Sequence, residues 1–208
     1  MLIAVSFGWF AEQMGSSRGW FFGQYTYTDV LGPRLGDVPL VIPLMWFSLT
    51  YAGYVICNLI VWQSAVDGAR GLGNAAMLSF LAAMIVTAFD LGADPYMVYT
   101  LKAWIMTKTD GAWFGETVQG FFGWVFVSFV IIFGFRMSVR KQALQPSSPF
   151  LRHHALVPLA LYGSNMVFQM ILGNPVEIRS IAPFAMGIPL LCALAGYQRW
   201  AAPAKASV

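Results

Sequence analysis

Two aspartates, Asp90 and Asp94, stand four residues apart in the segment Ala88-Phe-Asp-Leu-Gly-Ala-Asp-Pro95. In a helix this spacing puts both carboxylates on one side, with their Cβ atoms about 5–6 Å apart. Two carboxylates that close in a low dielectric cannot both ionise cheaply, so one is expected to hold a proton near neutral pH. The pair therefore predicts a general acid.

Two other interpretations of this pair stay open. The acids could form an interfacial helix end whose charges pair with Lys102 or Arg34. They could also bind Mg²⁺ that bridges to a diphosphate, as an Asp-x-x-x-Asp pair can do. The magnesium site would require a second acidic motif and several basic partners, and neither is clear in the sequence.

A third acid, Glu12, precedes a segment rich in aromatic residues, Phe21-Phe-Gly-Gln-Tyr-Thr-Tyr-Thr-Asp29. Glu12 is expected in or just under the headgroup layer, or else as a surface acid paired with Arg18. Tyr25 and Tyr27 are typical of interfacial aromatic belts. They could instead line a pocket for an apolar chain and present ring faces to a cation.

Polar residues elsewhere favour structural roles. Asn165 and Gln169, four residues apart in an apolar segment, are expected to form hydrogen bonds between helices, and Asn58 is interpreted in the same way. His153 and His154 are adjacent but have no Cys or carboxylate at ligand spacing, so no metal site is expected there. No cofactor-binding motif is found either.

The elements that carry these residues are predicted from the distribution of charge. Only 10% of the 208 residues are charged and 58% are hydrophobic, whereas about a quarter of a globular chain is usually charged. Five uncharged stretches span 29, 19, 19, 24 and 19 residues, at 38–66, 71–89, 117–135, 153–176 and 180–198. Each approaches or exceeds the roughly 20 residues that cross a bilayer as a helix. A soluble enzyme and a nucleic-acid-binding module are excluded.

We therefore predict an all-α, polytopic membrane bundle that forms a single transmembrane domain over residues 1–208. The apolar runs are continuous, which favours helices over barrel strands. The first helix is short or truncated, because fourteen residues span only about 21 Å. The long connections Gly15–Val38 and Asp94–Gly120 are expected to be ordered at the interface. Six helices are predicted, at Met1–Met14, Pro39–Gln63, Leu72–Ala93, Phe121–Met137, Ala155–Leu172 and Ile181–Trp200.

Charge also predicts the orientation in the cell membrane. With six crossings, the face that carries both termini has seven basic residues and the opposite face has five. The positive-inside rule therefore places the termini in the cytoplasm. Eight of the nine acids fall on the opposite face and only Asp67 on the cytoplasmic one, so the non-cytoplasmic face is chemically distinct.

Several motifs resemble the carotenoid biosynthesis membrane-protein family, whose characterised members include carotenoid hydratases. They are Glu12-x-x-Gly15, the run Gly19-Trp-Phe-Phe-Gly-Gln-Tyr-Thr-Tyr-Thr-Asp29, and Asp90-x-x-x-Asp94-Pro95. Trp104 and Phe121-Phe-Gly-Trp124 match further landmarks, in the family's order. Family members usually have more sequence before the Glu-x-x-Gly. They tend to show Gly-Val-Pro and an Asn where this chain has Gly115-Glu-Thr117 and Gly120.

The resemblance implies an enzyme that adds water across the terminal double bond of a linear carotenoid, a bilayer-dissolved polyene. One of Asp90 and Asp94 would donate the proton, and the other, or Glu12, would orient water. No metal or cofactor is implied. The end-group pocket would be lined by Tyr25, Tyr27, Trp104, Phe22, Trp124 and Asp29. The alternatives are a non-catalytic carotenoid-binding or scaffold protein and a magnesium-dependent prenyltransferase. The oligomeric state is not predicted.

Overall fold

The computed structural model describes residues 1–66, 71–141 and 148–201, and helices make up most of them. Five helical segments of the described chain are long and apolar enough to cross a membrane: Val41–Trp62, Leu72–Leu101, Val118–Val139, Pro149–Leu172 and Glu177–Ala201. The predicted membrane bundle is therefore confirmed as the fold class. The α-helices are α1 (Leu2–Arg18), α2 (Val41–Trp62), α3 (Leu72–Tyr96), α4 (Val118–Val139), α5 (Pro149–Leu172), α6 (Glu177–Ala185) and α7 (Gly187–Ala201).

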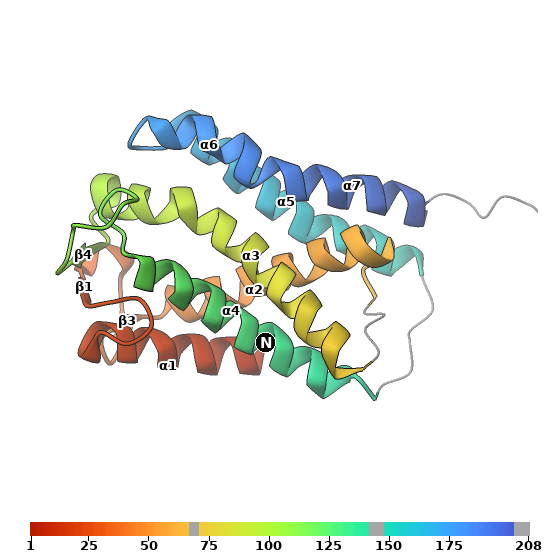
Figure 1. Cartoon of the computed structure of the whole chain (residues 1–208), viewed down its shortest axis with the longest axis horizontal. Coiled ribbons are helices and arrows are strands. Elements are labelled where there is room, and N and C mark those ends of the chain that lie inside the picture. The colour runs from red at the N-terminus through yellow and green to blue at the C-terminus, as the bar shows by residue number, and fades with distance from the viewer. Residues whose placement is uncertain (67–70, 142–147, 202–208) are drawn as a thin grey trace, which may run out of the picture.

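The helices lie roughly along one direction, and α3 packs most extensively against α4 (Figure 1). Helix α2 contacts α1, α3 and α7, so it lies at the centre of the bundle. Its residues Trp46, Ile56 and Leu59 are completely buried. Helix α1 spans 17 residues, or about 25 Å, and is longer than predicted at its carboxyl end.

Helix α3 continues past its predicted end at Ala93, through Pro95, and is followed by a π-helical turn, η2 (Met97–Leu101). Proline has no backbone N–H, so the carbonyl of Leu91, four residues earlier, has no partner from that position. The indole N–H of Trp113 donates to this carbonyl at 2.7 Å. The loop before α4 is thereby attached to the last turns of α3.

The predicted sixth helix, Ile181–Trp200, is divided into α6 and α7 around Met186. Pro189 cannot donate to the carbonyl of Ala185, and its ring crowds that carbonyl. The helix is therefore interrupted at Met186, between the end of α6 and the start of α7. Helix α6 also begins four residues earlier than predicted, at Glu177.

The two long connections are ordered, and they pair with each other. Strand β1 (Tyr25–Tyr27) is antiparallel to β4 (Trp104–Met106), with Tyr25 opposite Met106 and Tyr27 opposite Trp104. A second pair, β2 (Arg34–Leu35) with β3 (Val38–Pro39), follows the 3₁₀ turn η1 (Asp29–Leu31). These strands lie together at the end of the bundle where α1 ends and α4 begins (Figure 1).

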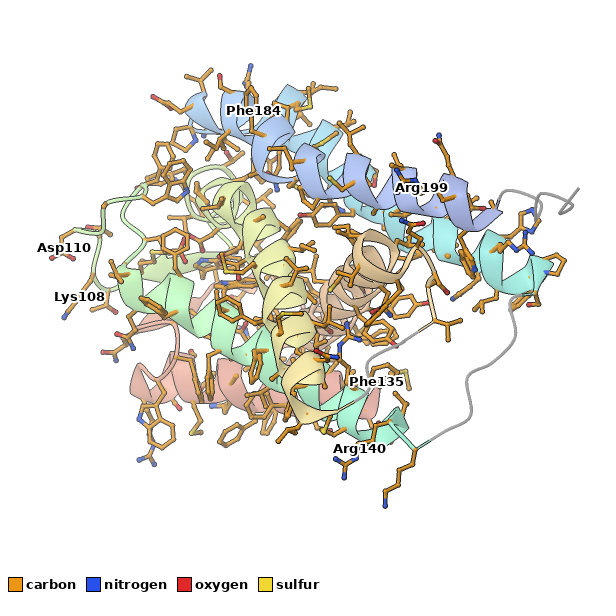
Figure 2. The ribbon with its side chains drawn as sticks, turned by 45° about the vertical axis from the view of Figure 1, so that its right-hand side comes forward. Lys108, Asp110, Phe135, Arg140, Phe184 and Arg199 are labelled. Atoms are coloured by element: carbon orange, nitrogen blue, oxygen red, sulfur yellow. The ribbon has the colours of Figure 1, made fainter. Side chains whose placement is uncertain are left out.

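The two ends of the bundle differ in their acidic residues. Lys108 and Asp110 lie at the end that carries β1 and β4, whereas Arg140 lies at the opposite end (Figure 2). Asp90 and Asp94 lie in the last turns of α3, and Glu116 directly precedes α4, so these acids belong to the first of these ends as well (Figure 1). Asp67, Arg70 and Lys205, which also entered the predicted topology, lie outside the described residues.

The amides predicted to connect helices behave differently from one another. Gln169 donates to the backbone carbonyl of Phe89 at 2.9 Å and joins α5 to α3. Asn58 accepts from Arg136 at 2.9 Å and joins α2 to α4. Asn165 is not buried and donates within its own helix to Leu161, so its predicted role between helices is wrong.

The contact between α7 and α2 predicts a large effect of a small substitution. A Cβ added at Gly196 would lie 2.0 Å from the carbonyl oxygen of Leu59, which is rigid backbone. We expect Gly196→Ala to destabilise the fold by about 1–3 kcal/mol, because the helices must separate. In the matched control, Gly187→Ala on the same helix, the Cβ meets only the Met166 sulfur, at 3.4 Å. Thermal unfolding in detergent tests this, and equal midpoints for the two variants would contradict it.

Candidate functional site

Glu12 is held in a buried hydrogen-bond network near the carboxyl end of α1. Its side chain is only 5% exposed. One carboxylate oxygen accepts from the hydroxyls of Tyr25 and of Tyr27, the latter at 2.6 Å. The other accepts from the indole N–H of Trp46 at 2.7 Å. A carboxylate has about four acceptor positions, so three donors leave about one position available.

Two glycines on α1 provide the space for this network. A Cβ at Gly8 would lie 2.8 Å from Trp46, and a Cβ at Gly15 would lie 2.9 Å from the hydroxyl of Tyr25. The Glu12-x-x-Gly15 motif therefore has a physical role. Its glycine lets a tyrosine from the following loop approach α1 next to the glutamate.

The pairing of β1 with β4 connects Glu12 to the carboxylates of α3. Successive strand residues point to opposite faces, and Tyr25 and Tyr27 are buried on one face while Thr26 is exposed on the other. The rings of Tyr27 and Trp104 pack edge to face, with their centroids 5.9 Å apart. Trp104 in turn donates its indole N–H to Asp94 at 2.9 Å.

Asp90 and Asp94 are both buried, at 1% and 6% exposure, as the four-residue spacing predicted for one helix side. Only Asp94 lines the cavity described below. Oδ2 of Asp90 is buried and has no hydrogen-bond partner among the residues that the structure describes. Asp90 therefore lies one turn behind Asp94.

A fourth buried acid, Glu116, is not among the site residues predicted from the sequence. It lies just before α4, is 4% exposed, and lines the same cavity as Glu12 and Asp94. Its Oε2 has no hydrogen-bond partner within the described chain. Burial raises the pKa of Glu116 to about 9, and the neighbouring charge of Asp94 adds to this rise. The protonated form is therefore favoured at neutral pH.

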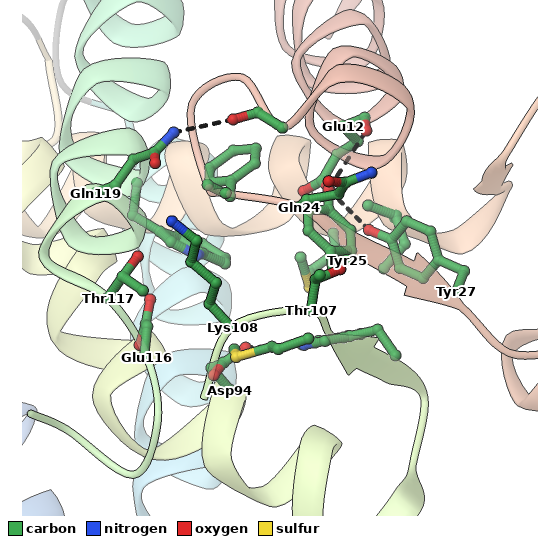
Figure 3. A pocket seen from close by; sticks show the side chains of 18 residues that line it. Glu12, Gln24, Tyr25, Tyr27, Asp94, Thr107, Lys108, Glu116, Thr117 and Gln119 are labelled. Carbon is green, nitrogen blue, oxygen red and sulfur yellow. Dashed lines mark hydrogen bonds between the residues drawn. The ribbon is translucent and has the colours of Figure 1, made fainter. Parts of the chain in front are cut away.

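The cavity has a volume of about 260 Å³ and lies between α1, the β1–β4 pair, the end of α3 and the start of α4. Figure 3 shows Glu12 on one side of it and Asp94 and Glu116 on the other. Part of its wall is apolar and comes from Phe22, Ile42, Met45 and Trp124. The exposed part of its rim is polar and comes from Gln24, Thr107, Lys108 and Gln119.

Most residues predicted to line an end-group pocket surround this cavity. Tyr25, Tyr27, Trp104, Phe22 and Trp124 all line it. Asp29 does not. It is exposed and forms a salt bridge of 2.7 Å with Arg34.

The ring of Trp46, which donates to Glu12, packs in a tilted arrangement against Trp124, with ring centroids 4.4 Å apart, and stacks on Phe22. Trp46 is a site residue that the sequence did not single out. A tryptophan in an apolar helix was the available signal, because a buried indole N–H usually finds an acceptor.

The two tyrosines remain hydrogen-bond donors across the physiological pH range. Burial, and then the charge of Glu12, raise the pKa of Tyr25 well above its ordinary value, and the same causes act on Tyr27. Both hydroxyls therefore keep their protons and can donate to a carboxylate. No group of three or more His, Cys, Asp or Glu side chains arranged to hold a metal ion occurs in the described ranges.

Comparisons with known proteins agree on one family. The model of the carotenoid biosynthesis protein family matches residues 1–194. A bisanhydrobacterioruberin hydratase of Haloarcula japonica is 28% identical over 162 residues, which cover 76% of this chain and 52% of the relative. The chain thus spans about half the length of that curated relative. No solved structure matches the chain described above.

Proposed function

The chain belongs to the carotenoid biosynthesis protein family, and we propose that it is a hydratase that adds water across the terminal double bond of a linear carotenoid. The observation that carries this proposal is the cavity in which an anchored Glu12 carboxylate faces buried carboxyl groups across aromatic walls. The relative's name, a hydratase, supports the same reaction class.

The reaction requires an acid, a stabilised cation and a water molecule. A carboxyl group protonates the less substituted carbon of the alkene, and the π electrons form the new C–H bond. A tertiary carbocation remains, and the oxygen of water then binds to it. The proton that water releases goes to a carboxylate, so the net change is the addition of one water molecule.

The two sides of the cavity fit these steps. The hydrogen bonds to Glu12 favour its ionised form, and a carboxylate there, together with the nearby Trp46 and Trp124 ring faces, stabilises a cation. The free acceptor position on Glu12 can receive the proton of water. The carboxyl groups opposite Glu12 provide the proton for the alkene. Among them, Asp94 reaches the cavity and Asp90 lies one turn behind it.

The substrate and the water can reach the cavity from different directions. Phe22, Ile42, Met45 and Trp124 suit the apolar end of a polyene, whereas the polar rim is accessible to water. We place this end of the bundle at the non-cytoplasmic boundary of the cell membrane, with the termini in the cytoplasm. The basic residues of the opposite end support this orientation.

Expression of the full chain in cells that make a linear carotenoid tests the function. The wild type should yield a pigment heavier by the mass of one water for each reacted end. The combined variant Asp90→Asn/Asp94→Asn should yield less of this product, because both carboxyl groups of α3 are removed. Asp110→Asn, an exposed acid at the same end, is the control and should match the wild type.

Two results would contradict the proposal. Pigment that co-purifies unchanged with the wild-type chain would favour a non-catalytic carotenoid-binding protein. Turnover that requires Mg²⁺ and releases diphosphate would favour a prenyltransferase.

A further inference from the structure

We propose that Glu116 is the proton donor of the hydration, and that Asp94 is a positioning residue beside it. This inference rests on the proposed function. Above, the proton came from the buried carboxyl groups opposite Glu12 without further distinction, and here it is assigned to a single residue. It begins with three facts about Glu116: it lines the cavity, it is 4% exposed, and its Oε2 has no hydrogen-bond donor in the part of the chain that the structure describes.

The hydrogen bonds of the three cavity acids distinguish their roles. Glu12 accepts from three donors, and Asp94 accepts from Trp104. Donors stabilise the charged form of a carboxyl group. Burial raises the pKa of Glu12, and the hydrogen bonds from its three donors offset part of this rise, so Glu12 is better suited than Glu116 to carry negative charge. Glu116 lacks such a donor at Oε2 and is suited to be neutral. Two acids whose surroundings differ in this way are assigned as base and acid of one reaction.

The charged groups around Glu116 support the neutral form. Asp94 and Asp90 approach it from α3, and Glu12 faces it from α1, so three acidic groups surround it. Lys108, from the loop before α4, is the basic residue among those that line the cavity, and it lies in the exposed rim. Burial with mainly acidic neighbours explains why the pKa of Glu116 lies at about 9.

The backbone around Glu116 fixes its position. Its N–H donates to the carbonyl of Trp113 at 2.9 Å, and the indole of that same Trp113 is bonded to Leu91 of α3. The next residue, Thr117, caps α4 by accepting from the N–H of Gly120 at 3.3 Å. Gly120 also leaves space for the acid, because a Cβ there would lie 2.8 Å from Oε1 of Glu116.

The proton balance is complete without any further reactant. Glu116 gives its proton to the alkene carbon and becomes a carboxylate. Water binds to the cation and releases a proton to Glu12. Glu12 returns to its ionised form, and Glu116 is protonated again, by proton exchange with water at the polar rim. Nothing is oxidised or reduced.

The test measures hydration rates against pH for the purified full chain with a linear carotenoid in lipid vesicles. The wild type should lose activity as pH rises through about 9, because its acid loses the proton. Glu116→Gln should be slower by about 10²-fold or more, the usual contribution of a general acid. Glu116→Asp should retain part of the rate and keep a decline at alkaline pH. The control Asp110→Asn, an exposed acid of the same loop, should match the wild type.

Asp94→Asn distinguishes the two candidate donors. With Glu116 as the donor, this variant stays active at low pH, and its alkaline decline moves to lower pH because a negative neighbour is lost. With Asp94 as the donor, Asp94→Asn is inactive at every pH, and Glu116→Gln keeps the wild-type rate and profile. That second result overturns the inference while the hydratase function stands. A wild-type chain that forms no hydrated product overturns both.

Unfolding experiments show whether Glu116→Gln acts on chemistry or on folding. The folded pKa of Glu116 lies above its ordinary value of 4.5, so the native state binds the proton more tightly than the unfolded state. Wild-type stability should therefore fall between about pH 4.5 and 9, and this contribution should be absent in Glu116→Gln. The variant is expected to be at least as stable as the wild type at pH 8. A clearly less stable variant would indicate a structural role and would overturn the inference.

Discussion

Glu12→Gln is expected to lower the hydration rate by about 10²-fold or more. The substitution keeps the size of the side chain but removes the negative charge that stabilises a carbocation and accepts the proton of water. The new amide group also cannot accept from all three donors, Tyr25, Tyr27 and Trp46. The rate of product formation by the purified variant measures the effect.

Two variants provide the comparison for Glu12→Gln. Tyr27→Phe removes one donor and keeps the charge, so its loss should be smaller, about 10-fold, as expected for one hydrogen bond to a charged group. Glu177→Gln changes an exposed acid at the same end of the bundle and should leave the rate unchanged. A Glu12→Gln rate equal to that of Glu177→Gln would mean that the network is structural.

Gly120→Asn is expected to lower activity by more than 10-fold without preventing folding. A Cβ at this position would lie 2.8 Å from Oε1 of Glu116 and 3.1 Å from its Cγ. These atoms belong to a flexible side chain, so the backbone can stay while the carboxyl group moves away from its place in the cavity. The activity and the thermal midpoint, measured on the same preparation, test both parts of this prediction.

The matched control for Gly120→Asn is Gly134→Asn on the same helix. A Cβ at Gly134 would lie 3.6 Å from Ile3, which is an ordinary contact far from the cavity. This variant should keep the wild-type rate. If Gly120→Asn hydrates the carotenoid as fast as Gly134→Asn does, the position of Glu116 does not matter for the reaction.

The sequence was sufficient for the membrane spans because the physical constraint on them is strict. A charged group in the hydrocarbon core is costly, so gaps between charges mark the helices. The residues at which the helices begin and end were less predictable. Helix α3 passes through Pro95 because Trp113, from a distant segment, bonds the carbonyl that the proline leaves free. The division at Met186 follows from Pro189, whose effect depends on packing that the sequence does not give.

The candidate site was predicted in part. Glu12, Asp94 and the aromatic residues meet in one cavity because β1 pairs with β4, and this pairing over more than seventy residues has no local signal. Glu116 could not be selected from the sequence, since its burial depends on how the loop before α4 packs against α3. Gly120, in the first turn of α4, provides the room that Glu116 occupies.

The most direct test of the hydratase assignment is the origin of the oxygen in the product. Purified full chain is incubated with a linear carotenoid in water enriched in a heavy oxygen isotope, and the pigment is analysed by mass spectrometry. Hydration through the Glu12 cavity predicts one labelled hydroxyl for each reacted end, and almost none with Glu12→Gln. Recovery of unlabelled, unchanged carotenoid from the wild-type protein would contradict it.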